Sequence, residues 1–317
     1  MMLISKTPYR ISFFGGGSDY PEWYNKYSGA VLSTSINKYI YITCRSLPNF
    51  FDHKYRIVWS KIEQVKKIRN ISHPVVKILL KHLKTPNGLE IHYDGDLPAG
   101  CGMGSSSAFT VGLINALYCM QEKKITNLEI AKKAIFFEQK IMKEIVGSQD
   151  QIATAIGGFN KIIFNSSNNF KIIPKVNKKN IKKLEDNLIL IFTGKKRNAQ
   201  DIAKKYVSKL STINKNFVNL MLDHVEEGEK ILNGGNIDEF GKLLNSAWIT
   251  KKKLSSHISD PEIDNLYDYA IKNGAIGGKL LGAGGGGFFL FYVKKEKKKS
   301  FLKNNKKIIK VPFNFTN

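Results

Sequence analysis

The chain has 317 residues, of which 42% are hydrophobic and 24% charged, and a formal net charge of +24 at pH 7. This length predicts about two domains of ~150 residues each. No run of about 18 apolar residues is present, which excludes a membrane-spanning helix. Cys44, Cys101 and Cys119 have no disulfide or zinc spacing, and the first residues lack a signal-peptide layout. We therefore expect a cytoplasmic protein.

The positive charge raises the question of a nucleic-acid or membrane partner. The excess is almost entirely lysine spread along the chain, and no aromatic-interleaved RNA-binding motif or helix-turn-helix pattern accompanies it. Lysines on solvated faces account for such a balance, so we expect neither partner and keep nucleic-acid binding as a distant alternative. The same positive field favours small anionic substrates.

Alternating and β-branched patterns predict strands, and apolar residues at helical spacing predict helices. In chain order, the predicted strands are Ile4–Lys6, Arg10–Phe14, Gly29–Ser35, Lys38–Ser46, Tyr55–Ser60, Leu89–Tyr93, Phe159–Phe164, Phe170–Ile173, Leu188–Phe192, Phe288–Val293 and Lys307–Val311. The predicted helices are Glu22–Lys26, Lys61–Arg69, Pro74–Leu83, Ser105–Gln121, one capped by Asn127, Ala199–Lys209, Asn214–Leu232, Ile237–Leu254 and Pro261–Asn273.

These elements mix strands and helices without strict βαβ alternation, which predicts an α+β fold with two domains. The lysine- and asparagine-rich segment at 175–183 is the expected junction. We therefore expect an N-terminal domain over residues 1–178 and a C-terminal domain over residues 179–317.

A glycine-rich segment lies between the predicted strand ending at Tyr93 and the helix that begins at Ser105. Glycines let backbone N–H groups close on an anion, and a helix N-terminus adds partial positive charge. We predict a phosphate cradle, with a serine-capped tight turn as the alternative. Its candidate nucleotide-binding residues are Pro98, Gly100, Gly102, Met103, Gly104, Ser105, Ser106 and Ser107.

The sequence has two further glycine loops, Gly15–Gly17 and Gly277–Gly287. Two familiar phosphate-binding motifs can be tested against these loops and the cradle. The cradle is not a Walker loop, because no lysine precedes Ser105. The later loop has the letters of a dinucleotide fingerprint, but a strand follows it instead of a helix. We therefore expect the three loops to line one site around a polyphosphate and its acceptor.

Three segments resemble the three motifs of the GHMP kinases (galactokinase, homoserine kinase, mevalonate kinase and phosphomevalonate kinase). They are Thr7–Asp19, Pro98–Ala108 and Lys279–Gly287, and together they span nearly the whole chain. The resemblance implies an N-terminal domain like domain 2 of ribosomal protein S5 and a ferredoxin-like C-terminal domain. It also implies phosphoryl transfer from ATP, with Mg²⁺, to a hydroxyl group.

The family's first motif usually ends in Gly-Glu-His-Thr-Asp, whereas Gly16 and Gly17 stand here in place of the Glu and His. With Gly147–Gln151 and the loop after Lys279, this form is similar to the D-glycero-D-manno-heptose 7-phosphate kinase branch. That branch implies phosphorylation of the anomeric hydroxyl to a 1,7-bisphosphate for surface-polysaccharide synthesis. The alternative is a fucokinase-like or galactokinase-like 1-kinase acting on an unphosphorylated sugar.

Kinase chemistry also suggests roles for individual residues. Asp150 is the expected base for the sugar hydroxyl proton, with a turn or cap residue as the alternative. The resemblance makes Arg10 the cation beside the acceptor oxygen, although a structural ion pair would use it equally. Ser106 and Glu138 match the family's magnesium ligands, and a solvated helix face is the other reading of Glu138.

The expected substrate-binding residues are Gly16, Gly17, Ser18, Asp19, Gln149, Arg197, Gly284 and Gly285. We expect Arg197 or one of its neighbours, Lys195 and Lys196, to bind a phosphate at the far end of the sugar, since guanidinium groups bind phosphate bidentately. A solvated loop charge is the alternative for Arg197. The expected partners are ATP and a small sugar phosphate, Trp59 is a candidate for the adenine site, and a homodimer is left open.

Overall fold

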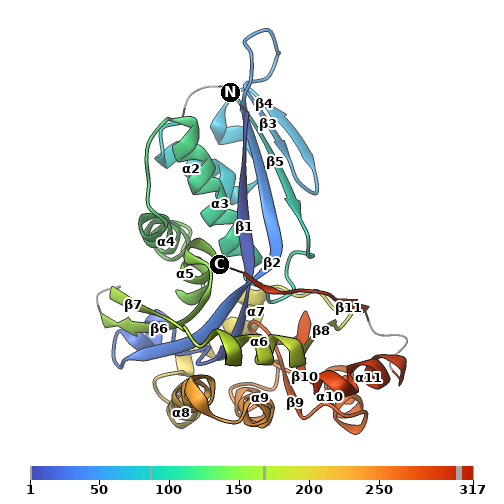
Figure 1. Ribbon diagram of the computed structural model, residues 1–317. Coiled ribbons are helices and arrows are strands. Elements are labelled where there is room, and N and C mark those ends of the chain that lie inside the picture. Colours follow the sequence, from blue (N-terminus) through green and yellow to red (C-terminus); the bar gives the residue numbers. More distant parts are fainter. Residues whose placement is uncertain (1, 86–87, 167–168, 305–308, 317) are drawn as a thin grey trace.

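The computed structural model describes residues 2–85, 88–166, 169–304 and 309–316, and its strands form two sheets (Figure 1). The larger sheet has the order β4-β3-β5-β2-β6-β7, with β1 and β12 also paired to β2. The smaller sheet has the order β11-β8-β10-β9. The bounds of the larger sheet are β1 Met2–Phe14, β2 Gly29–Ser46, β3 Tyr55–Val58, β4 Ile62–Val65, β5 Leu89–Gly95, β6 Phe159–Asn165, β7 Asn169–Pro174 and β12 Phe315–Thr316. Those of the smaller are β8 Leu188–Phe192, β9 Gly277–Leu280, β10 Phe288–Tyr292 and β11 Ile309–Val311.

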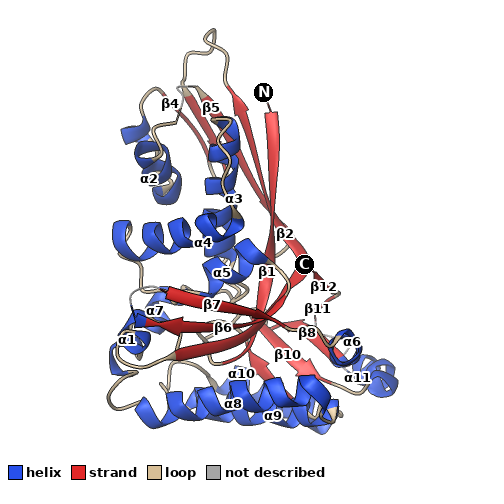
Figure 2. Cartoon of the chain, turned by 60° about the vertical axis from the view of Figure 1, so that its left-hand side comes forward, coloured by secondary structure: helices blue, strands red, loops and turns tan. Residues whose placement is uncertain are grey.

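Helices cover the sheets in two groups (Figure 2). In the first, α3 packs against β1 and β2 and contacts its neighbours α2, α4 and α5. In the second, α8 and α9 pack together, α8 against β2 and α9 against β9. The helix bounds are α1 Pro21–Tyr24, α2 Pro74–His82, α3 Ser105–Met120, α4 Asn127–Ile135, α5 Gln149–Ile156, α6 Lys178–Asn187, α7 Ala199–Ala203, α8 Lys215–Gly234, α9 Ile237–Lys252, α10 Pro261–Lys272 and α11 Lys298–Asn304. None of the helices within the described ranges is long and apolar enough to cross a membrane.

Strands β1 and β2 are each continuous where the sequence predicts two strands. Pro8 does not interrupt β1, because β1 pairs only with β2 and a proline is tolerated on an edge strand. The register shifts between Pro8 and Tyr9, which marks an irregularity at that position. The end of β1 then packs against α9, where Phe13 and Phe14 both contact the Phe240 ring. This contact brings the first glycine loop next to the second helical group.

Two local predictions, of the Lys61–Arg69 helix and of the Asn127 cap, are wrong, and the expected junction stays a prediction. Lys61–Arg69 forms β4 and a short 3₁₀ turn instead of a helix, because Ile62–Val65 pairs with β3 and tertiary pairing overrides the helix propensity of Glu and Gln. The cap of α4 is Thr126, not Asn127, because Thr126 and Glu129 form a reciprocal capping box. The segment at 175–183, expected as a junction, contains the start of α6, whose cap Asn177 accepts from Asn180 N.

The expected last strand is present as β11, and its first two residues, 307–308, lie outside the described residues. Strand β12 has no counterpart in the sequence prediction. It pairs with β2 through Phe315 and Thr316, so the end of the chain returns to the larger sheet. Because residues after 178 thus contribute a strand to the larger sheet, the division of the chain into domains at residue 178 stays a prediction.

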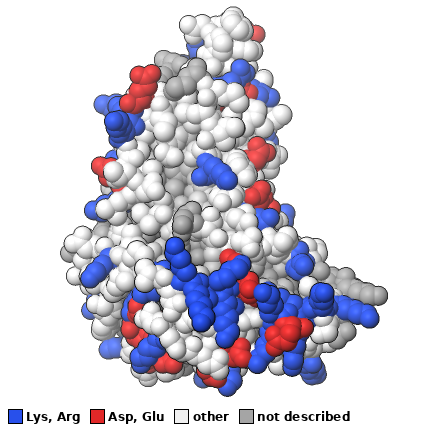
Figure 3. All heavy atoms as spheres, viewed as in Figure 1, with Lys and Arg blue, Asp and Glu red and all other residues white. Residues whose placement is uncertain are grey.

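Basic side chains are visible over the lower part of the face in Figure 3, with acidic side chains between them. Several lysines of the chain form ion pairs, such as Lys195 with Asp260 and Lys294 with Asp238. Exposed pairs of this kind contribute at most about 1 kcal/mol each. The surface charge is thus mixed in sign over this face, as expected for solvated lysines.

Candidate active site

The three glycine loops meet at one cavity of about 490 Å³. The first loop contributes Gly15, Gly16 and Gly17, and the third contributes Gly282 and Ala283. The second contributes Ala99, Gly100, Gly102 and the start of α3. Segments more than 250 residues apart in the sequence therefore share one wall, as the glycine pattern predicts.

The second and third loops touch backbone to backbone. A Cβ on Gly102 would lie 2.6 Å from Leu281 O, and one on Gly287 would lie 2.2 Å from Cys101 O. Both glycines also have positive φ angles, of 80° and 103°. A side chain at either position would separate the loops, so these glycines are required for the close approach itself.

The second loop ends in a helix N-terminus that faces the cavity. Gly104 is the N-cap of α3, with a left-handed φ of 77°, and Ser105, Ser106 and Ser107 form the first turn. No acidic residue lies in that turn, so the free N–H groups and the helix dipole favour an anion. This geometry supports the predicted phosphate cradle.

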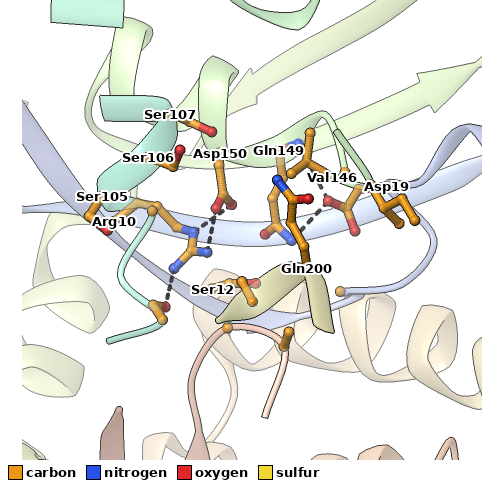
Figure 4. A pocket seen from close by; sticks show the side chains of 18 of the residues that line it. Arg10, Ser12, Asp19, Ser105, Ser106, Ser107, Val146, Gln149, Asp150 and Gln200 are labelled. Atoms are coloured by element: carbon orange, nitrogen blue, oxygen red, sulfur yellow. Dashed lines mark hydrogen bonds and ion pairs between the residues drawn. The ribbon is translucent and has the colours of Figure 1, made fainter. Parts of the chain in front are cut away.

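Arg10 and Asp150 point toward one another across the cavity (Figure 4). Arg10 Nε donates to Asp150 Oδ1 and Arg10 Nη2 to Asp150 Oδ2, each at 2.8 Å. Arg10 Nη1 donates to Gly102 O at 2.7 Å. The Arg10 side chain is 3% exposed and that of Asp150 is 25% exposed. The pair therefore couples the phosphate loop to a carboxylate that remains open to the cavity.

Asp150 lies in the first turn of α5, where the sequence predicts no helix. Its neighbour Gln149 donates to Asp19 Oδ2 at 3.0 Å, and Gly17 N donates to Asp19 Oδ1 at 2.9 Å. Burial raises the pKa of Asp19 to about 6. The buried Gln149 Oε1 has no hydrogen-bond partner among the described residues. Asp19 thus orients Gln149 and leaves it an acceptor for a hydroxyl group.

Three more cations line the cavity. Lys279 Nζ donates to Phe13 O at 2.6 Å, and Lys251 Nζ donates to Leu280 O at 2.8 Å. Burial lowers the pKa of Lys279 to about 7 and moves that of Lys251 well below its usual value. The Arg197 guanidinium nitrogens are buried, and none has a hydrogen-bond partner among the described residues. The cavity is therefore lined by basic side chains, and burial disfavours the charged forms of the two lysines.

Glu138 is fully buried behind the cradle, not on the cavity wall. Its Oε2 accepts from Ser107 at 2.9 Å and from Gln151, while Oε1 has no partner within the described ranges. Burial and then the Glu144 carboxylate raise the pKa of Glu138 to about 7. Ser106, the other predicted ligand, is exposed at the cavity.

No group of three or more His, Cys, Asp or Glu residues able to hold a metal occurs in the described part of the chain. Mg²⁺ in phosphoryl-transfer sites is typically held by one or two carboxylates together with substrate phosphates. The free Glu138 oxygen and the Ser106 hydroxyl, both hard oxygen donors, fit such a site.

Four aromatic side chains that contact one another form part of the cavity wall. His73 stacks on Phe109 at 4.9 Å, Trp59 meets His73 edge-on at 4.8 Å, and Tyr93 meets Phe109 at 5.3 Å. All four line the cavity. Trp59 was the sequence's candidate for the adenine site, and a flat apolar wall of this kind fits a purine.

Several predicted site residues lie outside the cavity wall, namely Pro98, Met103, Ser18, Glu138, Gly284 and Gly285. Met103 is buried and accepts from Arg10 N through its carbonyl at 3.1 Å. The Ser18 hydroxyl donates to Gly15 O and Ala30 O. Gly284 packs against Ile258. Met103, Ser18 and Gly284 thus support the loops from outside the cavity, whereas Glu138 lies behind the cradle.

Lys251 lies outside every motif of the sequence, and no role was predicted for it or for Lys279. Lys251 belongs to a run of three lysines that resembles a solvated helix end. One signal was available, because Lys251 follows Leu244, Ala247 and Trp248 at helical spacing, and all four are buried. Its neighbour Lys253 falls off that face and is exposed.

Two models of one protein family match this chain. The model of the GHMP kinase N-terminal domain matches residues 68–158, and that of the GHMP kinase C-terminal domain matches residues 229–307. The chain belongs to the GHMP kinase family, so it is an ATP-dependent kinase that phosphorylates a hydroxyl group.

Among curated relatives, the D-glycero-alpha-D-manno-heptose 7-phosphate kinase of Campylobacter jejuni is 32% identical over 88% of this chain and 86% of its own length. The galactokinase of Pyrococcus furiosus is 24% identical over 88% of this chain and 85% of its own length.

Among solved structures, a D-glycero-D-manno-heptose 1-phosphate kinase from Bacteroides thetaiotaomicron superposes with a TM-score of 0.80 at 24% identity, covering 99% of this chain and 96% of its own. A putative sugar kinase from Campylobacter jejuni has a TM-score of 0.74 at 26% identity, covering 99% and 96%. The predicted α+β GHMP-kinase fold is confirmed.

Proposed function

We propose that the chain transfers the γ-phosphoryl group of ATP to the anomeric hydroxyl of D-glycero-D-manno-heptose 7-phosphate, giving the 1,7-bisphosphate. The observation that carries the proposal is the bidentate Arg10–Asp150 pair beside the serine-glycine cradle. The 32% identity to a heptose 7-phosphate kinase supports the choice of sugar. Gly16 and Gly17 support it too, because they leave no carboxylate or imidazole where galactokinase-like first motifs have one.

In this mechanism the chain's residues position both reactants. The cradle at Gly102–Ser107 binds the ATP phosphates, and the aromatic wall around Phe109 binds the adenine. Gln149 Oε1 accepts a hydrogen bond from a sugar hydroxyl. Asp150 takes the proton of the anomeric hydroxyl group as the sugar oxygen bonds to the γ-phosphorus and the bond to ADP breaks.

Arg10 has two functions in this reaction. Its two N–H groups fix the Asp150 carboxylate, and its positive charge stabilises the anomeric oxygen as it becomes anionic. Glu138 and Ser106 would hold Mg²⁺, which when bound neutralises charge on the transferring phosphates. The product would enter nucleotide-heptose synthesis for surface polysaccharides.

The test is a product-detected kinase assay on heptose 7-phosphate, free heptose, fucose and galactose, with ATP and Mg²⁺. We expect heptose 7-phosphate to give the highest kcat/KM and the 1,7-bisphosphate as product. The alternative, a kinase for an unphosphorylated sugar, is favoured by the matches to a bifunctional fucokinase at 26% and a galactokinase at 24% identity. Faster turnover of fucose or galactose would establish that alternative.

A further inference from the structure

We infer that Arg197, Lys251 and the turn at Gly282–Ala283 form a subsite for the phosphate group that the acceptor sugar carries. The inference rests on the proposed function, because it requires a phosphorylated acceptor. It gives Lys251 a role in selecting a phosphorylated over an unphosphorylated sugar. Lys251 is part of α9 and lies in none of the three motif segments.

The two cations border the same glycine. Lys251 Nζ donates to Gly282 O at 2.5 Å and to Leu280 O at 2.8 Å. A Cβ on Gly282 would lie 2.6 Å from Arg197 Nη2. Gly282, Ala283, Arg197 and Lys251 all line the cavity. The absent side chain thus leaves room for the Arg197 guanidinium, and the Gly282 carbonyl holds Lys251 at the same corner of the site.

Both groups retain unused hydrogen-bond donors. An ammonium has three N–H donors and a guanidinium has five. Lys251 uses two of its donors on carbonyl oxygens, and Arg197 uses none of its guanidinium donors within the described residues. A phosphate group offers three acceptor oxygens, and guanidinium binds such oxygens bidentately. The corner therefore supplies the donors that a phosphate needs.

The charged groups that act most on Lys251 would be complemented by an anion. Lys251 is 6% exposed, and the charged groups that most affect it are all cations. After burial itself, Lys279, Arg197 and Arg10 lower the pKa of Lys251. Buried charges are costly unless they are paired. A phosphate bound at this corner would supply the opposite charge and hold Lys251 in its ammonium form.

The phosphate could belong to ATP or to the acceptor, because Arg197 also borders the cradle. Its Nη2 lies 3.3 Å from the Cβ position of Gly102. The ATP phosphates already have the α3 N-terminus and the hydroxyl groups of its first turn. Among the described residues, the hydrogen bonds of Lys251 Nζ go to carbonyl oxygens of the third loop. We therefore assign the subsite to the acceptor.

The experiment compares Lys251→Met with Lys253→Met. Methionine keeps most of the side-chain length and removes the charge, and Lys253 is the exposed residue two positions along. We expect Lys251→Met to raise KM for heptose 7-phosphate at least about tenfold, with KM for ATP and for free heptose nearly unchanged. Lys253→Met should change none of these values. Thermal unfolding reports whether each variant is folded.

A binding measurement separates the inference from the proposed function. Inorganic phosphate should raise the thermal midpoint of the wild-type enzyme in the presence of ATP and should have no such effect on Lys251→Met. A larger KM for ATP in Lys251→Met, or equal effects on phosphorylated and free sugar, would overturn the inference. If no sugar 7-phosphate is turned over but the phosphate effect depends on Lys251, the proposed substrate fails and the anion subsite stands.

Discussion

The cavity contains two arginines in opposite situations. Arg10 is fully engaged, with hydrogen bonds to both oxygens of Asp150 and to Gly102 O. Arg197, also buried at its guanidinium, has no partner for any of its three nitrogens within the described residues. The first arginine is neutralised by the protein itself, so its geometry is set before substrate arrives. The second has no such partner among the described residues, so we expect the ligand that binds beside it to carry a negative charge.

The largest expected effect comes from removing the carboxylate of the engaged pair. Asp150→Asn keeps the shape and removes the proton acceptor, so kcat should fall by about 10²–10⁴-fold. Affinity for ATP, measured by calorimetry, should be retained, because Asp150 is not part of the cradle. A variant that keeps more than a tenth of wild-type kcat would show that Asp150 is not the base.

Replacing each arginine by methionine tests the contrast directly. Arg10→Met leaves Asp150 without its bidentate partner, so both kcat and the thermal midpoint should fall. Arg197→Met breaks no hydrogen bond of its guanidinium, so stability should be retained or increased while KM for a phosphorylated sugar rises about tenfold. Equal losses of stability in the two variants would contradict the assignment of Arg197 to a ligand.

Gly147→Ala should disturb the part of the site that contains Asp19, Gln149 and Asp150, because Gly147 lies in the loop before α5. The added Cβ would lie 1.9 Å from Asp19 Oδ2, so the Asp19–Gln149 contact must shift. We expect a loss of about 1–3 kcal/mol in the free energy of unfolding, from overpacking, together with a higher KM for the sugar. Gly234→Ala is the matched control, because a Cβ added there meets no atom within 4 Å and Gly234 has no positive φ.

The smallest effect concerns pH. The pKa of Asp19 is raised by burial from 3.8 to about 6 in the folded state. Between these values the folded state binds more protons than the unfolded state, so the Asp19 contribution to stability falls as pH rises from about 4 to about 6. Asp19→Asn should remove this loss, because the Gln149 amide can turn to present its free Oε1.

The measurement is urea unfolding of both proteins at pH 4 and pH 7. The stability of Asp19→Asn relative to wild type should be greater at pH 7 than at pH 4, by at most about 3 kcal/mol at 1.36 kcal/mol per pKa unit. A difference between the two proteins that does not change with pH would show that the Asp19 carboxyl titrates normally.

Much of this site follows from local pattern. The glycine loops and the cradle at Gly100–Ser107 were predictable because backbone geometry that requires glycine leaves a direct trace in the sequence. Arg10 and Asp150 were predicted as site residues from the chemistry of phosphoryl transfer, and both line the cavity. The helix that carries Asp150 was not predicted. Lys61–Arg69 was mispredicted because strand pairing with β3 outweighed propensity.

The sequence by itself determined the family, the three loops and the types of residue that phosphoryl transfer uses. Only the tertiary structure decided which charges face one another. It paired Arg10 with Asp150, left Arg197 without a partner, and turned Lys251 inward while Lys253 remained at the surface. The reason is physical: glycine constraints act within a few residues, whereas the environment of a charge depends on segments from everywhere in the chain that fold around it.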